Sequence, residues 1–375
     1  MRFMAMRPFI LTACMLMVVA LAVATPKTRP RAPLTSPSSA PGQAQPQSQP
    51  PAPVASQDSD SQQPGYAISM TVPVVNVDVV VTDNDGNYLT GLKKENFRLT
   101  EDGAPQTITN FSTADAPITV VVLVEYSRRA YGWYLYTARS WADVFLHQLK
   151  PSDWVALESF AMRPNVEVDF THNISEVEQG LINLVLPTFS ESVIYDALLD
   201  TMDRMHDVKG KKSILVLASG EDTFSRHTLN DTLARLKETD VSVYCVGVGE
   251  QFALETDMRG GNGSENLNYL QAQNQLKAFS QLTGGRTWFP RFQGEIPGVM
   301  SDVAASLRNQ YSLGYSPTNQ STDGKYRKIK VELVEPDGSP LTVTNQKNKK
   351  VKYQVYARQG YVAPKAGAAG GAGGD

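Results

Sequence analysis

Residues 118–129 have the sequence ITVVVLVEYSRR and carry the strongest fold signal in the chain. The first seven of these residues are β-branched or aliphatic, which is typical of a parallel strand buried on both faces. Polar and charged residues follow at once, with Glu125, Ser127 and Arg129 where a helix should begin. Ligands of open α/β sheets bind beyond the carboxyl ends of such strands. The sequence therefore predicts a candidate binding site directly after this strand.

The section around this strand alternates strand patterns with amphipathic helix patterns. This alternation predicts an α/β fold in which a parallel sheet has helices on both faces. Residues 153–160 and 166–170 are expected to form a hairpin at the sheet edge. Ser175, followed by Glu178, predicts a capping box at the start of a helix. The other predicted strands cover residues 212–218, 241–248 and 286–289, and the other predicted helices cover residues 131–149, 193–206, 228–238, 269–281 and 296–309.

Both flanks of this section have β-strand patterns. Residues 67–114 contain two Asp-Gly turn signals, and a hairpin is expected around the second, at Asp102-Gly103, with residues 106–111 as its return strand. Residues 310–363 again alternate strands and turns. Neither flank alone has enough strands to be stable, so we expect the two to pair into one β-sandwich-like module. Lysines of the second flank are expected to guard a sheet edge, with contact to anionic polymers as the alternative.

Residues 1–24 have the pattern of a secretory signal peptide. Arg2 and Arg7 precede an apolar run, and residues 22–24 form an Ala-x-Ala cleavage pattern. Cleavage there predicts a secreted or periplasmic protein of the cell envelope with no membrane span. Two alternatives stay open, an uncleaved anchor and a lipoprotein box ending at Cys14, although most of the apolar run follows that cysteine.

Two segments have compositions that do not favour folding. Residues 25–66 are rich in Pro, Ser and Gln and predict a disordered linker, and residues 364–375 predict a disordered Gly/Ala-rich tail. Once the signal is removed, Cys245 is the single cysteine and lies in a predicted core strand, which favours a buried thiol. The formal net charge of −3 gives no indication of nucleic-acid binding.

Short motifs in the flanks are shared with one bacterial family. Residues 91–103 contain Gly-Leu, Phe and Glu-Asp-Gly in succession, and residues 310–315, 324–329 and 358–361 have the sequences QYSLGY, GKYRKI and RQGY. Together with the central strand, these motifs resemble the VWFA-related proteins of acidobacterial type. The resemblance covers roughly residues 69–362. It implies a Rossmann-like von Willebrand factor type A domain at residues 115–309, between the two β segments.

Type A domains of this kind hold a divalent cation through an Asp-x-Ser-x-Ser motif, a Thr loop and a further Asp. In this sequence Glu125 stands at the first Asp position, Ser127 at the first Ser position and Arg129 at the second. Ser192 stands at the Thr position of the second loop. The third loop has the sequence SGED, in which Ser219 replaces the Asp and Asp222 is retained. The resemblance therefore implies a ligand-binding face with a degenerate metal site.

The residues at positions 129 and 219 argue against a bound metal. Two unit charges 4 Å apart interact by about 4 kcal/mol at an effective dielectric constant near 20, and a divalent ion roughly doubles the repulsion from Arg129. Ser219 also removes a carboxylate that would compensate this charge. We therefore expect no cofactor. If Mg²⁺ were bound, Ser127 and Ser192 would be its ligands.

We hypothesise that the Arg129 guanidinium takes the place of the ion. It could pair with Glu125, Glu191 or Asp222, or receive an acidic side chain of a protein partner, because guanidinium groups suit carboxylates. The alternative is that Arg129 points into solvent and the face is inert.

Enzyme motifs are weak in this sequence. Ser219 follows a strand, but nothing orients a histidine such as His227 toward it, and two cysteines and scattered histidines make no zinc site. We therefore expect a non-enzymatic, exported protein-recognition or adhesion module whose partner is an unknown protein. The alternative is a structural or assembly component of the cell envelope that acts through the β module.

Overall fold

The computed structural model describes residues 74–113, 116–128, 144–185, 188–248, 263–344 and 349–365. These residues belong to one compact unit that spans residues 69–375. The predictions for the signal peptide, the linker, most of the tail, Arg129 and the first part of helix 131–149 lie outside the described residues. Within the described part of the chain, no helix is both long and apolar enough to cross a membrane.

The α/β section contains a sheet of strand order β10-β9-β8-β5-β6-β7. Counted along the chain, this is the 3-2-1-4-5-6 order of a doubly wound Rossmann-like sheet, as the sequence predicts for a von Willebrand factor type A domain. Neighbouring strands are parallel except β6 and β7, which form the predicted edge hairpin. The strands are β5 Ile118–Glu125, β6 Trp154–Phe160, β7 Pro164–Thr171, β8 Lys211–Ala218, β9 Ser242–Gly247 and β10 Thr287–Trp288.

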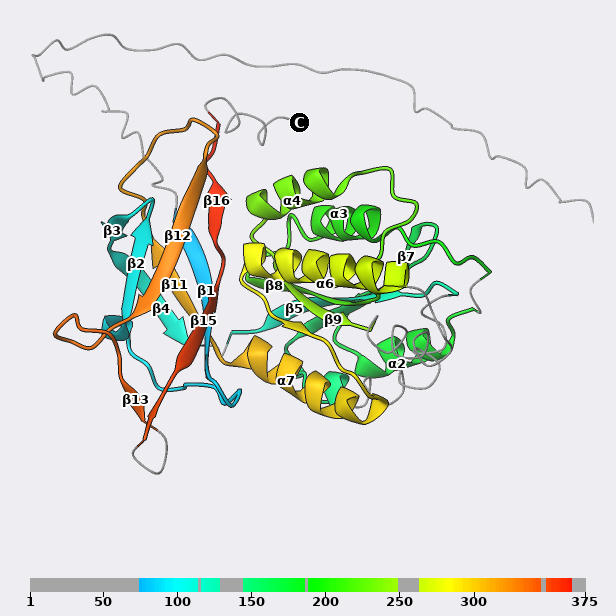
Figure 1. Ribbon diagram of the computed structural model, residues 1–375, viewed down its shortest axis with the longest axis horizontal. Helices are drawn as coiled ribbons and strands as arrows, with labels where there is room; N and C mark the ends of the chain where they lie inside the picture. The colour runs from blue at the N-terminus through cyan, green and yellow to red at the C-terminus, as the bar shows by residue number, and fades with distance from the viewer. Residues whose placement is uncertain are drawn as a thin grey trace, which may run out of the picture. The chain divides into compact units, whose positions relative to one another are not determined.

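Helices cover both faces of this sheet (Figure 1). Because side chains of a strand alternate between faces, Val120 and Val122 pack in the core cluster that includes residues of α2 and α7. Val121 and Leu123 pack in the cluster that includes residues of α3, α4 and α6. All eight residues of β5 are buried. The helices are α2 Ile174–Ile182, α3 Ile194–Arg204, α4 Leu229–Glu238, α6 Gly263–Thr283 and α7 Ile296–Arg308, with short 3-10 turns η1 Lys94–Asn96 and η2 Gln293–Glu295.

The two flanks pair into a β-sandwich-like module, as expected. One sheet has the order β15-β1-β11-β4 and the other β16-β12-β2-β3, so each combines strands from both ends of the chain. Their apolar side chains share one core that includes Val79, Leu99 and Leu313. The strands are β1 Val75–Asp83, β2 Phe97–Glu101, β3 Ala104–Gln106, β4 Ile108–Thr113, β11 Gln310–Tyr315, β12 Tyr326–Leu333, β15 Tyr353–Ala357 and β16 Gly360–Val362, with a separate pair β13 Val343–Thr344 and β14 Lys350–Val351.

Several flank motifs meet in one buried network. The Glu101 carboxylate is 2 % exposed and accepts hydrogen bonds from the hydroxyls of Tyr315 at 2.7 Å and Tyr361 at 3.0 Å. Glu101 belongs to the Glu-Asp-Gly motif, Tyr315 ends QYSLGY and Tyr361 ends RQGY. Burial and the neighbouring Glu101 carboxylate raise the pKa of Tyr361 above the ordinary range of a phenol. These motifs therefore hold the β module together.

Four local predictions are corrected. Asn173, not Ser175, caps α2, because its side chain accepts from the Ser175 amide. The turn at Asp102-Gly103 joins β2 to β3, whereas β4 pairs with β11 in the other sheet. Helix α6 is longer than the predicted residues 269–281. Strand β12 lies inside its sheet between β16 and β2, so its lysines do not guard an edge.

Candidate functional site

The predicted site lies at the switch point of the sheet, where the strand order reverses. Strands β5 and β8 are neighbours, with Val124 opposite Leu217 near their carboxyl ends. A reversal of strand order of this kind opens a crevice in doubly wound folds. Glu125 ends β5 and Ser219 directly follows β8. The fold therefore brings these two sequence-predicted residues side by side.

At this switch point the Glu125 carboxylate accepts hydrogen bonds from protein donors. One oxygen, Oε1, accepts from the Ser127 hydroxyl at 2.9 Å. The other, Oε2, accepts from both the amide and the hydroxyl of Ser219, each at 2.7 Å. All three residues are buried, and Glu125 is 2 % exposed. A buried carboxylate needs such donors to remain charged at low cost.

The turn after Ser219 requires glycine. Gly220 has φ +85°, in the left-handed region that other residues rarely adopt. A Cβ at this position would lie 2.8 Å from the Ala272 carbonyl oxygen of α6. The close approach of the two segments fixes the direction in which the third loop leaves the strand. It also holds the Ser219 amide in position to donate to Glu125.

Ser192, the third hydroxyl residue of the predicted site, is held by its backbone. Its carbonyl oxygen accepts from the amides of Thr223 at 2.9 Å and Phe224 at 3.1 Å, and its own amide donates to the Thr223 hydroxyl. The Ser192 side chain is buried, and its Oγ has no hydrogen-bond partner among the described residues. The second and third loops are therefore joined by main-chain contacts rather than through this hydroxyl.

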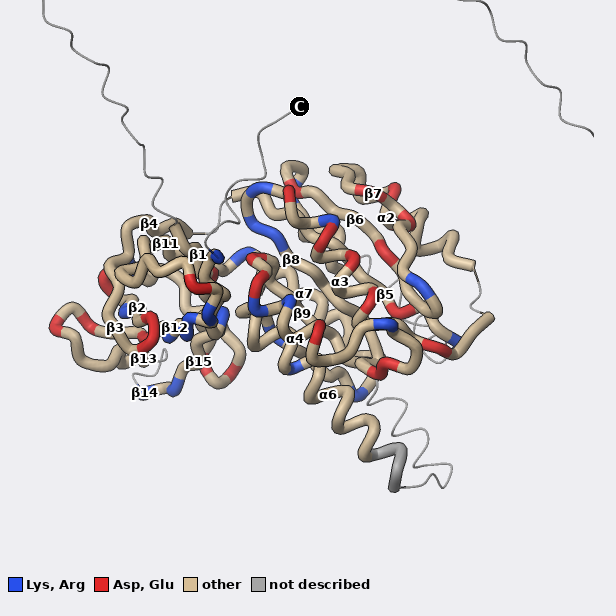
Figure 2. The backbone as a smooth tube through the Cα atoms, turned by 90° about the horizontal axis from the view of Figure 1, so that it is seen from above, with Lys and Arg blue, Asp and Glu red and all other residues tan. Residues whose placement is uncertain are grey.

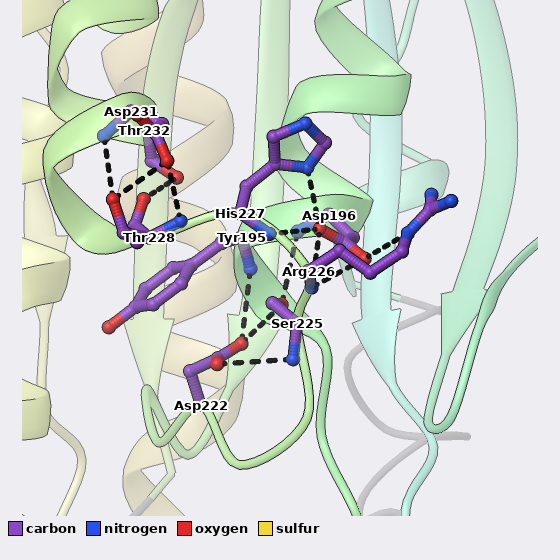
Figure 3. Close-up of polar contacts among 9 residues, drawn as sticks. All are labelled: Tyr195, Asp196, Asp222, Ser225, Arg226, His227, Thr228, Asp231 and Thr232. Atoms are coloured by element: carbon purple, nitrogen blue, oxygen red, sulfur yellow. Dashed lines mark hydrogen bonds and ion pairs between the residues drawn. The ribbon is translucent and has the colours of Figure 1, made fainter.

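The Asp222 carboxylate lies at the start of α3 and accepts hydrogen bonds there (Figure 3). Its carboxylate accepts from the Tyr195 amide at 3.4 Å and from the amide and hydroxyl of Ser225. A carboxylate near a helix N-terminus is favoured by the unpaired amides there. Burial raises the pKa of Asp222 above its ordinary value, and the hydrogen bonds from Ser225 and Tyr195 act in the opposite direction.

A second carboxylate on α3 fixes the far end of the same loop. Asp196 is 7 % exposed and accepts from the amides of Arg226 and His227, from Arg226 Nε at 3.2 Å and from His227 Nδ1 at 2.7 Å. Burial raises its pKa, but the hydrogen bonds from Arg226 and His227 outweigh burial and leave the pKa below 3.8. Thr228 then caps α4 with Asp231 in a reciprocal capping box. Residues 219–228 thus form a loop that hydrogen bonds hold in place at several points.

The donor set of this cluster does not fit Mg²⁺, which takes six oxygen ligands in near-octahedral array. Both oxygens of Glu125 already accept protein hydrogen bonds, and Ser219 supplies donors where a ligand carboxylate would stand. Among the described residues there is no group of three or more His, Cys, Asp or Glu side chains that could hold a metal. Ser192 Oγ alone cannot replace the missing carboxylate.

The structure thus brings Glu125, Ser127 and Ser219 into one cluster and sets Ser192 and Asp222 on the adjoining loops. Arg129 lies outside the described residues. An open cavity of about 470 Å³ borders the cluster and is lined by Arg128, Ser190, Glu191 and Thr223. Sequence reasoning did not predict this cavity as a site, although Arg128 lies within the quoted strand-end motif and could have been considered with Arg129.

Comparisons with known proteins gave matches only among solved structures. No protein-family profile matches the sequence, and no curated protein matches it significantly. The von Willebrand factor type A structure from Catenulispora acidiphila has a TM-score of 0.41 and 9% identity, covering 72% of this chain and 74% of that one. The vWF domain of the type V pili tip protein Mfa5 from Porphyromonas gingivalis has a TM-score of 0.38 and 11% identity, over 52% and 96%. The conserved hypothetical protein BatB from Bacteroides thetaiotaomicron has a TM-score of 0.38 and 12% identity, over 51% and 100%.

Proposed function

We propose that this chain is an exported, non-enzymatic protein-recognition module whose binding face is the switch-point edge of the α/β sheet. The observation that carries the proposal is the Glu125 cluster, in which protein donors satisfy the carboxylate at the place where a metal would be held. Recognition through this face then depends on side chains, and Arg129 supplies the positive charge that meets an acidic group of the partner. Ser192, Ser219 and Asp222 shape the loops around it.

The rigidity of the surrounding loops supports a binding role. Main-chain hydrogen bonds join Arg128 to Phe189 and Ser192 to Thr223 and Phe224. Loops that are ordered before binding lose less conformational entropy when a partner docks. Ligands usually bind at the switch point in this sheet arrangement, and Arg128 and Thr223 are exposed there beside the buried Glu125 cluster. The Ser219 hydroxyl donates to the Glu125 carboxylate, but both residues are buried, so a substrate does not reach this pair.

A structural or assembly role through the β module is the second candidate. Exposed Lys328 and Lys330 alternate with buried Arg327 and Ile329 along β12, which is an interior strand. Lys and Arg residues gather around β12 and β14 (Figure 2). Because the lysines of β12 do not lie at a sheet edge, a contact with an anionic envelope polymer is a specific reason for them.

The two candidates are separated by site-specific crosslinking in the native organism. A photoreactive residue at Ser190 probes the switch-point face, and one at Lys328 probes the β module. We expect the Ser190 probe to give a defined protein adduct that Arg129→Ala removes and Lys328→Ala leaves unchanged. If only the Lys328 probe gave adducts, and Arg129→Ala did not change them, the β module would be the surface that contacts the partner.

A further inference from the structure

The cavity beside the Glu125 cluster is lined by two charged side chains that have no partner among the described residues. Arg128 and Glu191 both line this space of about 470 Å³. The Arg128 guanidinium is exposed, and neither it nor the Glu191 carboxylate makes a hydrogen bond or ion pair among the described residues, although other charged side chains of the face are paired. Cavities of roughly 300–1,000 Å³ are typical of ligand sites. An unpaired cation and anion in one cavity call for a ligand with both charges.

Two exposed aromatic residues are next to lining residues in the chain. Phe189 is 52 % exposed and directly precedes the lining residue Ser190, and Phe224 is 57 % exposed and directly follows the lining residue Thr223. Both are held by the backbone, because the Phe189 carbonyl accepts from the Arg128 amide and the Phe224 amide donates to Ser192. Aromatic side chains are enriched in binding hot spots.

We infer that this cavity receives a protein segment that carries one acidic and one basic side chain next to an apolar one. The acidic side chain pairs with Arg128, the basic side chain with Glu191, and the apolar side chain packs against Phe189 or Phe224. A ligand with an acidic side chain alone would place its carboxylate near the Glu191 carboxylate. Like charges in one pocket weaken binding. The inference rests on the proposed function, since it names the chemistry of the partner at that face.

The test uses the full chain and a displayed library of disulfide-closed ten-residue peptides. We expect enriched peptides to combine an acidic, a basic and an apolar residue. Arg128→Gln and Glu191→Gln should each weaken their binding about tenfold, the usual scale for a charge-assisted hydrogen bond. Arg98→Gln and Glu238→Gln, which make the same charge changes on exposed side chains elsewhere, should have no effect. The double variant Arg128→Glu with Glu191→Arg should bind peptides in which the two charges are exchanged.

Other outcomes reject the inference in distinguishable ways. Loss of binding in EDTA would mean that a metal carries the contact. Binding that survives Arg128→Gln but is abolished by Arg129→Ala would reject the cavity and retain the proposed face. If only Arg98→Gln weakened peptide binding, the binding surface would lie on the β module. Both the inference on the cavity and the proposed switch-point face would then be rejected. If no peptide is enriched, or if the enriched peptides carry a single charge, the paired-charge ligand is wrong.

Discussion

The length of one side chain decides the chemistry of the switch point. Glu125 is one methylene longer than the Asp expected at this position, and its carboxylate reaches the amide of Ser219 on the neighbouring strand end. Because position 219 carries Ser rather than a carboxylate, hydrogen bonds from Ser219 to Glu125 join the ends of β5 and β8. An Asp at both positions would instead place two negative charges together, which a cation would have to neutralise.

The first prediction concerns the stability of this cluster. Glu125→Ala removes the carboxylate that accepts from the Ser127 hydroxyl and from the Ser219 amide and hydroxyl, so we expect the free energy of unfolding to fall by about 2–4 kcal/mol. Urea unfolding followed by circular dichroism measures this change. The matched variant Glu238→Ala removes an exposed carboxylate of α4 and should change stability by less than about 1 kcal/mol. Equal effects of the two substitutions would show that the cluster contributes little.

The second prediction reverses the substitutions at the site. The triple variant Glu125→Asp, Arg129→Ser and Ser219→Asp restores the acidic and hydroxyl positions of a type A metal site. We expect it to bind Mg²⁺ or Mn²⁺ in calorimetry, whereas the natural chain gives no heat of binding up to millimolar metal. Adding Ser127→Ala to the triple variant should abolish the signal. Metal binding by the natural chain that Ser127→Ala removes would contradict our assignment of the site.

At the scale of elements, hydrogen bonds with α3 organise the third loop. Asp222, near the beginning of the loop, accepts from the Tyr195 amide of α3. Asp196, on α3, accepts from the amides of Arg226 and His227 near the end of the loop. These hydrogen bonds fix both ends of the loop, and Thr223 and Phe224 are exposed between them at the proposed binding face.

The third prediction follows from the lowered pKa of Asp196. A carboxyl whose pKa is lower in the folded state stabilises the fold above its unfolded pKa, near 3.8, and this stability is lost as the pH falls through the folded value. We expect Asp196→Asn to be less stable than the natural chain at pH 7 and to lose less stability below about pH 4. Urea unfolding between pH 2 and pH 7 tests this. Parallel pH profiles of the two proteins would contradict it.

Patterns within one element were readable from the sequence, and contacts between elements were less so. The apolar run of β5 and the Thr228 start of α4 follow from local chemistry, and both are found. The α2 cap was misplaced because Asn173 and Ser175 are both good capping residues, and only the backbone geometry distinguishes them. The Glu125 contact to Ser219 joins residues 94 positions apart, so no local pattern reveals it.

At the scale of the whole molecule, the β module is built from both ends of the chain. Its pairing was predicted from the small number of strands in each flank, but the allocation of strands to sheets was not, because β4 and β12 have no sequence feature that selects their neighbours. The flank motifs that support the family resemblance meet at Glu101 inside this module. They therefore stabilise the β module and carry no information on the proposed binding face.

The fourth prediction tests this discontinuous module. Both neighbours of β1, which are β11 and β15, and one neighbour of β2, which is β12, come from the second flank. A chain ending at Asn309 leaves these strands without their partners, and isolated strands are not stable in water. We expect the amides of Val75–Asp83 and Phe97–Glu101 to lose protection in hydrogen exchange, while those of β5 and β8 keep it. A chain ending at Lys365 should retain full protection and serves as the control. Protected amides in β1 of the shorter chain would show that the first flank folds without the second.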